Sequence, residues 1–137
     1  MNGGPYVACD LPLGRVNVRN YDALILPAGP MNPDRLRAIP AAVDIVRAFY
    51  DAGKIIAAIC HAPHILVEAG IVKERRLTSW PSIRTDLMNA GAQWLDQDVV
   101  TDKGLITSRS PKDLDAFIAK IIEEIGEGDH LDRREAA

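Results

Sequence analysis

Short runs of apolar residues alternate along the chain with stretches in which apolar residues recur at helical spacing. Residues 23–26 and 54–59 are apolar runs closed by turn residues, a pattern that predicts strands buried on both faces. Between them, the spacing over residues 40–52 predicts a helix that Gly53 ends. A shorter helix is expected to begin at Asn32-Pro33-Asp34, which offers an N-cap, a proline and an acidic first turn.

The second half of the chain continues the alternation. Helices are predicted over residues 63–69, 81–90 and 111–125, and strands over 76–79, 92–95, 99–100 and 105–107, the last two joined in a hairpin through Asp102-Lys103-Gly104. Residues 1–20 are predicted to be irregular, with at most an edge strand, and the charged residues 126–137 are expected to form a frayed tail. Residues 21–125 are therefore expected to form one α/β domain with a mostly parallel sheet and helices on both faces.

The amino-acid composition argues against several classes of function. The 137 residues include 16 basic and 19 acidic side chains, so 16 − 19 gives a net charge of −3, and 47% of residues are hydrophobic. This balance argues against a nucleic-acid partner, and no apolar run is long enough to cross a membrane. Two cysteines in different contexts and an N-terminus unlike a signal peptide favour a reducing, cytoplasmic location.

Cys60 lies at the carboxyl end of the predicted strand 54–59, directly before a helix. This is the layout of a nucleophile elbow, and the helix N-terminus is expected to lower the cysteine pKa. A buried structural cysteine is the alternative, and position alone leaves the two about even. The neighbouring His61 favours function, as general base or thiolate partner, and its amide with Gly29 forms a candidate oxyanion hole.

The remaining histidines, the second cysteine and the large aromatic residues are not expected to take part in catalysis. His64 is interpreted as a packing or surface histidine, His130 as a tail residue without a partner, and Cys9 as incidental. Core or interface positions are expected for Trp80, Trp94 and Phe49. The sequence has no motif for a metal or a nucleotide, and no cofactor is expected.

Several motifs in order resemble the PfpI family of intracellular cysteine proteases, general stress proteins and protein deglycases, within the class I glutamine amidotransferase-like superfamily. They are Ala23-Leu24-Ile25-Leu26-Pro27-Ala28-Gly29, Ala57-Ala58-Ile59-Cys60-His61-Ala62-Pro63 and Thr78-Ser79-Trp80-Pro81-Ser82-Ile83. The resemblance runs from about residue 21 to 125 and implies a flavodoxin-like three-layer sandwich with a nucleophile elbow.

The resemblance also implies roles for single residues. Cys60 matches the elbow cysteine, His61 the histidine after it, and Gly29 with the His61 amide the oxyanion-hole donors. Asp34 matches an acidic residue that, in hexameric members, reaches the cysteine–histidine pair of a neighbouring subunit, so a homo-oligomer (dimer or hexamer) is expected. Ala28 and Ala62 stand where the family usually has glycine, and Ala28 would be strained if its position needs positive φ.

Family members begin with a strand, a helix and a further strand that find no counterpart in the first twenty residues. The chain is therefore expected to be an N-terminally truncated form that lacks a glutamate which, in the family, contacts the cysteine. A βαβ unit takes about 30 or more residues, which the segment ahead of Tyr21 cannot hold.

Two functions follow as hypotheses. The first is a Cys60-dependent hydrolase or deglycase that acts on peptide bonds, or on small aldehydes such as methylglyoxal and the groups they glycate, without cofactor or metal. The alternative is a non-enzymatic stress protein in which Cys60 senses oxidants, or an inactive truncated homologue.

Overall fold

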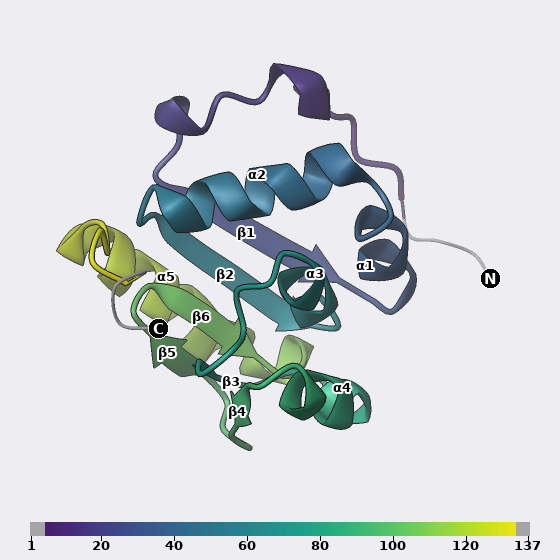
Figure 1. Ribbon diagram of the computed structural model, residues 1–137, viewed down its shortest axis with the longest axis vertical. Coiled ribbons are helices and arrows are strands. Elements are labelled where there is room, and N and C mark those ends of the chain that lie inside the picture. Colours follow the sequence, from purple (N-terminus) through teal and green to yellow (C-terminus); the bar gives the residue numbers. More distant parts are fainter. Residues whose placement is uncertain (1–4, 134–137) are drawn as a thin grey trace.

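The computed structural model describes residues 5–133, and its centre is a four-stranded sheet of order β1-β2-β6-β5 (Figure 1). The strands β1 (Ala23–Ala28), β2 (Ile55–Cys60) and β6 (Leu105–Ser108) run parallel, and β5 (Val100–Asp102) is antiparallel to β6. A separate pair, β3 (Arg76–Leu77) and β4 (Gln93–Trp94), is also parallel. The predicted α/β class with a mostly parallel sheet is confirmed.

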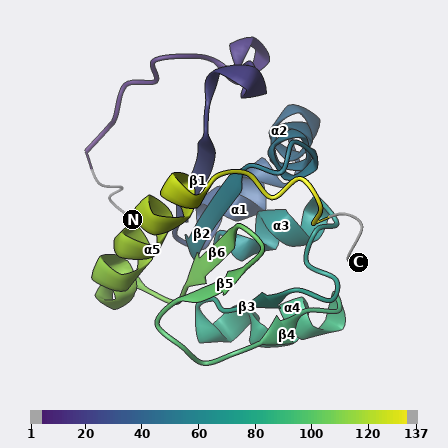
Figure 2. The same cartoon turned by 90° about the vertical axis from the view of Figure 1, so that its left-hand side faces the viewer.

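Helices cover both faces of this sheet, which gives three layers (Figure 2). On one side lie α1 (Met31–Leu36), α2 (Pro40–Asp51) and α3 (Pro63–Glu68), and on the other lies α5 (Leu114–Glu127). The helix α4 (Arg84–Asn89) packs beside β4. Single 3₁₀ turns span Leu13–Arg15, Val18–Asn20, Pro81–Ile83 and Pro111–Asp113.

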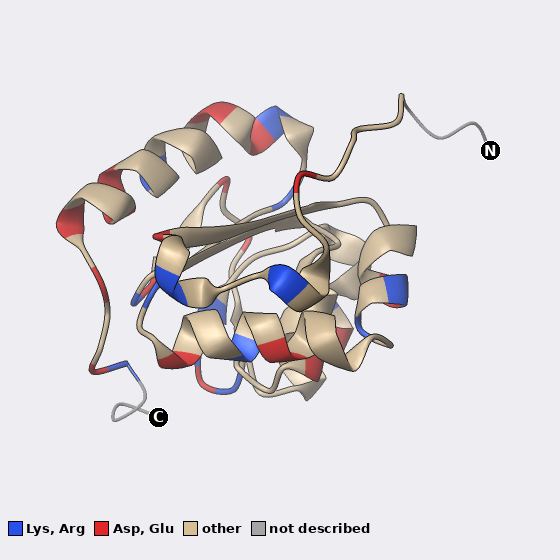
Figure 3. Cartoon of the chain, turned by 90° about the horizontal axis from the view of Figure 1, so that it is seen from above, with Lys and Arg blue, Asp and Glu red and all other residues tan. Residues whose placement is uncertain are grey.

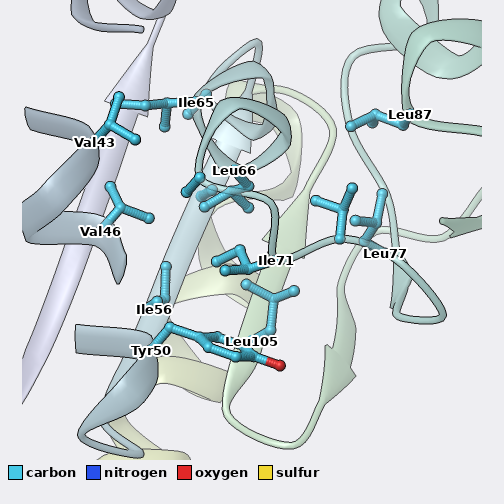
Figure 4. Packing of buried hydrophobic residues seen from close by; sticks show 14 of the residues in the cluster. Val43, Val46, Tyr50, Ile56, Ile65, Leu66, Ile71, Leu77, Leu87 and Leu105 are labelled. Atoms are coloured by element: carbon cyan, nitrogen blue, oxygen red, sulfur yellow. The ribbon is translucent and has the colours of Figure 1, made fainter. Parts of the chain in front are cut away.

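Successive side chains of β2 point to opposite faces of the sheet, so the apolar core consists of two clusters. Ile56 and Ala58 face α2 and α3 in the larger cluster, part of which Figure 4 shows, while Ile55, Ala57 and Ile59 face α5. Because β2 is buried over its whole length, the residue that ends it is held in a fixed position.

The glycines that end two helices behave as predicted. Gly53 after α2 and Gly70 after α3 both adopt φ +73°, a conformation that favours glycine. The predicted hairpin also forms, since Lys103 and Gly104 between β5 and β6 both have positive φ, as a two-residue turn of this kind requires.

Residues 5–22 hold 3₁₀ turns and no strand, in agreement with the irregular segment expected there. Two expectations are wrong. Among the described residues β1 pairs with β2 alone, so it is an edge rather than a strand buried on both faces, and Ile25 is 51% exposed. Asn32 is not an N-cap, because α1 already begins at Met31 and the Asn32 amide instead donates to the Pro27 carbonyl at 3.4 Å.

The tail does not fray within the described range. After α5 the chain folds back, and the His130 amide donates to the Gly53 carbonyl at 2.6 Å. Arg133, 1% exposed, donates to the carbonyls of Phe49 and Tyr50 and lies 4.2 Å from the centre of the Tyr50 ring. Burial lowers the Arg133 pKa to about 10, and the carbonyls and the ring face compensate its charge.

Charged side chains of both signs are interspersed over the described helices (Figure 3). None of these helices combines the length and the apolar character that a membrane crossing needs.

Candidate active site

Cys60 ends β2 in a strained backbone conformation, with φ +66°. For a residue other than glycine, such a conformation costs on the order of 1–2 kcal/mol. Hydrogen bonds hold it: the Trp80 amide donates to the Cys60 carbonyl at 2.8 Å, and the Ala62 amide donates to the Ile59 carbonyl at 3.2 Å. The turn into α3 thus places Cys60 at the carboxyl edge of the sheet, where parallel α/β folds bind ligands.

The side chain of His61 turns back toward the cysteine. Its Nδ1 lies 3.2 Å from the Cys60 Sγ, and its Nε2 lies 3.4 Å from the Ser82 Oγ. The imidazole stacks against the Trp80 ring, with centroids 6.0 Å apart and planes 25° apart. Trp80 is 41% exposed and forms one wall of the site rather than part of the core.

Ser82 is the residue of this cluster that the sequence did not single out. It lies within the recognised run Thr78 to Ile83, but a serine in a turn carries no signal of its own. Of the other large aromatic residues, Phe49 is core as expected, and the Trp94 indole donates to the Ser79 hydroxyl at 2.9 Å.

The electrostatics of the pair differ from the sequence expectation. Burial raises the pKa of the Cys60 thiol, and a hydrogen bond from the His61 backbone amide offsets part of this rise. The expected lowering by the helix fails because α3 has only six residues and begins with Pro63, which has no N–H to offer. Burial, and then the charge of His64, lower the pKa of His61. Both shifts favour the thiol and the neutral imidazole over the thiolate–imidazolium pair.

His64 is not an isolated surface histidine. Its Nε2 lies 3.1 Å from a carboxylate oxygen of Asp86 on α4, which fixes the ring within one helical turn of His61. His130 also has a partner, because its Nε2 lies 3.1 Å from the Glu124 carboxylate. Cys9 is exposed and free.

The candidate oxyanion-hole donors are only partly available. The His61 amide donates to the Ala28 carbonyl at 3.4 Å, a long bond. Among the described residues, no atom lies within 4 Å of where a Cβ at Gly29 would be, so a ligand could lie against its backbone. Ala28 has no positive φ and Ala62 has φ −55°, so both positions accept alanine without strain.

Asp34 lies exposed on α1. Among the described residues no hydrogen bond or ion pair connects it to His61. The role that the resemblance implies for it requires a second copy of the chain.

A pocket of about 340 Å³ is lined in part by Trp80 and Pro81, while neither Cys60 nor His61 belongs to its lining. Its wall includes Arg109, which follows β6 directly and binds the Asp113 carboxylate through Nε at 2.9 Å and a terminal nitrogen at 3.0 Å. The Arg109 side chain also donates to Asp96 at 3.0 Å. These bonds order the loop that leads to α5. Within the described range, no cluster of three or more His, Cys, Asp or Glu side chains could hold a metal ion.

Comparisons with known proteins show the family of the chain. The model of the DJ-1/PfpI family matches residues 1–124, so the match begins ahead of residue 21, where the recognisable motifs start. A deglycase of Pyrococcus horikoshii is 42% identical over 120 residues, which cover 88% of this chain and 72% of that protein. Protein/nucleic acid deglycase 2 of Escherichia coli is 41% identical over 125 residues, covering 90% and 72%.

Solved structures share the fold. A two-domain protein of Anabaena variabilis, containing DJ-1/ThiJ/PfpI-like and ferritin-like domains, superposes with a TM-score of 0.81 and 38% identity. The superposition covers 83% of this chain and 32% of that one.

Proposed function

Because the chain belongs to the DJ-1/PfpI family, we propose that it is a Cys60-dependent deglycase, acting in the reducing cytoplasm on small dicarbonyls and on the protein or small-molecule groups they glycate. The observation that carries the proposal is the strained Cys60 at the edge of the sheet, with the Nδ1 of His61 3.2 Å from its sulfur. The names of relatives from two organisms support the choice of deglycation.

The short contact between Cys60 and His61 defines the first step. For a methylglyoxal hemiaminal, the Cys60 thiol passes its proton to the Nδ1 of His61 as the sulfur bonds to the carbon that carries the amine; the C–N bond breaks, and the imidazolium protonates the departing amine. A hydrogen then moves from this carbon to the neighbouring ketone carbon through an enediol, so the first carbon becomes a thioester and the second an alcohol. Water hydrolyses the thioester to lactate and restores the thiol. Because one carbon is oxidised as its neighbour is reduced, the net reaction consumes one water and needs no external oxidant or reductant.

The oxyanion would be held by the backbone amides of Gly29 and His61. The His61 amide now bonds to the Ala28 carbonyl over 3.4 Å, and a negatively charged oxygen is a stronger acceptor than that carbonyl. Removing one such donor from an oxyanion hole typically lowers kcat by about 10²–10³.

The test measures release of unmodified amine from methylglyoxal-glycated peptide by the chain, beside Cys60→Ala and Cys60→Ser. We expect turnover by the parent chain and background rates for both variants. Equal rates for the parent chain and Cys60→Ala would refute the proposal. Cleavage of an unmodified peptide amide instead would assign the site to proteolysis, the other activity considered from the sequence.

We propose further that the active form is a homo-oligomer in which Asp34 of one copy faces His61 of another. A carboxylate there would stabilise the imidazolium. Mixing Asp34→Asn with Cys60→Ala should restore part of the activity, since a mixed assembly contains an intact Cys60 beside an intact Asp34. A single-copy mass in solution, or mixtures no more active than their components, would reject this arrangement.

A further inference from the structure

Ser82 is placed at the opposite end of the His61 ring from the thiol. It lies in the 3₁₀ turn Pro81–Ile83, and the hydrogen bond from the Trp80 amide to the Cys60 carbonyl fastens the start of this turn to the elbow. Its Oγ is 3.4 Å from Nε2, while the Cys60 Sγ is 3.2 Å from Nδ1. One imidazole therefore bridges a thiol and a hydroxyl that are 22 residues apart in the sequence (82 − 60).

The position of the ring proton shows why the hydroxyl matters. A neutral imidazole that is to accept the thiol proton at Nδ1 must carry its own hydrogen on Nε2. That N–H then needs an acceptor, and Ser82 Oγ is the one within hydrogen-bond distance among the described residues. After proton transfer Nε2 still donates, now from an imidazolium, and a hydrogen bond from a charged donor is stronger.

Within one chain, the surroundings leave this edge of the ring to Ser82. The Trp80 ring covers one face of the imidazole. The titratable groups near His61 are Cys60 on β2 and His64 on α3, and His64 is itself bound to Asp86 on α4. None of these groups bonds to Nε2, so in a single chain Ser82 is its partner, and the proposed Asp34 of a second copy would be a second acceptor for the same hydrogen.

We propose that Ser82 is a positioning residue for the Cys60–His61 pair, acting from the same chain: it accepts the Nε2 hydrogen, keeps Nδ1 free for the thiol proton and stabilises the resulting imidazolium. The proposal deepens the proposed function and rests on it for its role in turnover. Its effect on the thiol can be measured without turnover.

The test is the pH profile of Cys60 alkylation by iodoacetamide, measured in a Cys9→Ser background because Cys9 is also exposed. Ser82→Ala is expected to move the midpoint to higher pH and to lower the rate at pH 7 by about 3- to 10-fold, since water replaces part of the lost hydrogen bond. Ser82→Thr keeps a hydroxyl and should stay within about twofold of the parent.

Thr85→Ala is the matched control, because this hydroxyl lies on α4 close in sequence, is exposed and makes no side-chain hydrogen bond in the described part of the chain. It should leave the profile unchanged. Melting temperatures show whether each variant folds as the parent does. A Ser82→Ala profile that superimposes on the parent profile, or equal shifts for Ser82→Ala and Ser82→Thr, would overturn the proposal.

Two failures remain distinguishable. If the alkylation profile shifts as expected but no Cys60-dependent deglycation occurs, the proposed function fails and the positioning role stands. If deglycation occurs and Ser82→Ala changes neither the profile nor kcat, the positioning role fails and the proposed function stands.

Discussion

Gly53 and Gly70 share one backbone conformation. Comparing an alanine variant at each position measures how much the packing of the C-terminal segment contributes to the free energy of unfolding. Each of these glycines follows a helix and has a φ of +73°. Alanine at Gly53 or at Gly70 should therefore lower the free energy of unfolding by the same strain of the left-handed conformation, about 1–2 kcal/mol. The surroundings differ. A Cβ at Gly53 would lie 2.7 Å from the backbone carbonyl carbon of His130 and 2.8 Å from the amide nitrogen of Leu131, whereas a Cβ at Gly70 would have no atom of residues 5–133 within 4 Å.

Gly53→Ala should therefore displace residues 130–133 in addition to straining the turn. The displaced segment loses the hydrogen bond from the His130 amide to the Gly53 carbonyl, worth about 0.5–1.5 kcal/mol. The expected totals are about 1–2 kcal/mol of unfolding free energy for Gly70→Ala and about 1.5–3.5 kcal/mol for Gly53→Ala.

Urea denaturation gives both free energies, and limited proteolysis reports the docking directly. Gly53→Ala should become sensitive to cleavage at Arg133 while Gly70→Ala stays protected. Free energies for the two variants that agree within about 0.3 kcal/mol, with equal protection of Arg133, would refute the reasoning, because the lost hydrogen bond alone should separate them by about 0.5–1.5 kcal/mol.

Three further predictions concern the site and its supports. Cys60→Gly should have a free energy of unfolding about 1 kcal/mol higher than that of Cys60→Ala, because glycine adopts φ +66° without strain; equal free energies would exclude stored strain at the elbow. His64→Gln should raise the pKa of His61, since it removes the charge that helps to lower it, and a proton NMR titration of the ring that shows no change would contradict the assignment. Asp113→Asn should lower stability at pH 7 by about 1–3 kcal/mol, because its carboxylate binds the Arg109 guanidinium and amide. Those bonds hold the pKa of Asp113 below its usual range, so the stabilisation is present above about pH 4, the usual unfolded-state value, and is lost as pH falls through the folded-state pKa. Melting curves from pH 7 to 2 should therefore converge for parent and variant, and a constant gap would contradict the linkage.

Local sequence signals were sufficient for much of the fold. The strand that ends in Cys60, the helices that end before Gly53 and Gly70, and the hairpin at Gly104 each depend on residues close together in the sequence. The elbow was predictable for the same reason, because a buried strand and the following helix fix the residue between them.

Contacts between distant segments were not predictable in this way. Ser82 meets His61 across 21 residues, and Arg133 meets Tyr50 across 83, and neither pairing leaves a periodic pattern. The exposure of β1 was misjudged because an apolar run looks the same whether one side of the strand is paired or two. The Cys60 pKa was misjudged because its burial depends on the packing around the turn, whereas the sequence showed only the helix behind it.

The raised pKa also bears on the choice between an enzyme and an oxidant sensor. A cysteine that senses oxidants reacts as a thiolate already present in the resting protein. Burial raises the pKa of Cys60 and so disfavours the thiolate. A thiol 3.2 Å from a neutral imidazole is instead suited to releasing its proton as an electrophile arrives, since the base is already within reach. The strained backbone at Cys60 is consistent with this demand, because it holds the sulfur close to Nδ1 at a measurable cost in stability. The contact between Cys60 and His61 therefore supports the proposed catalytic role.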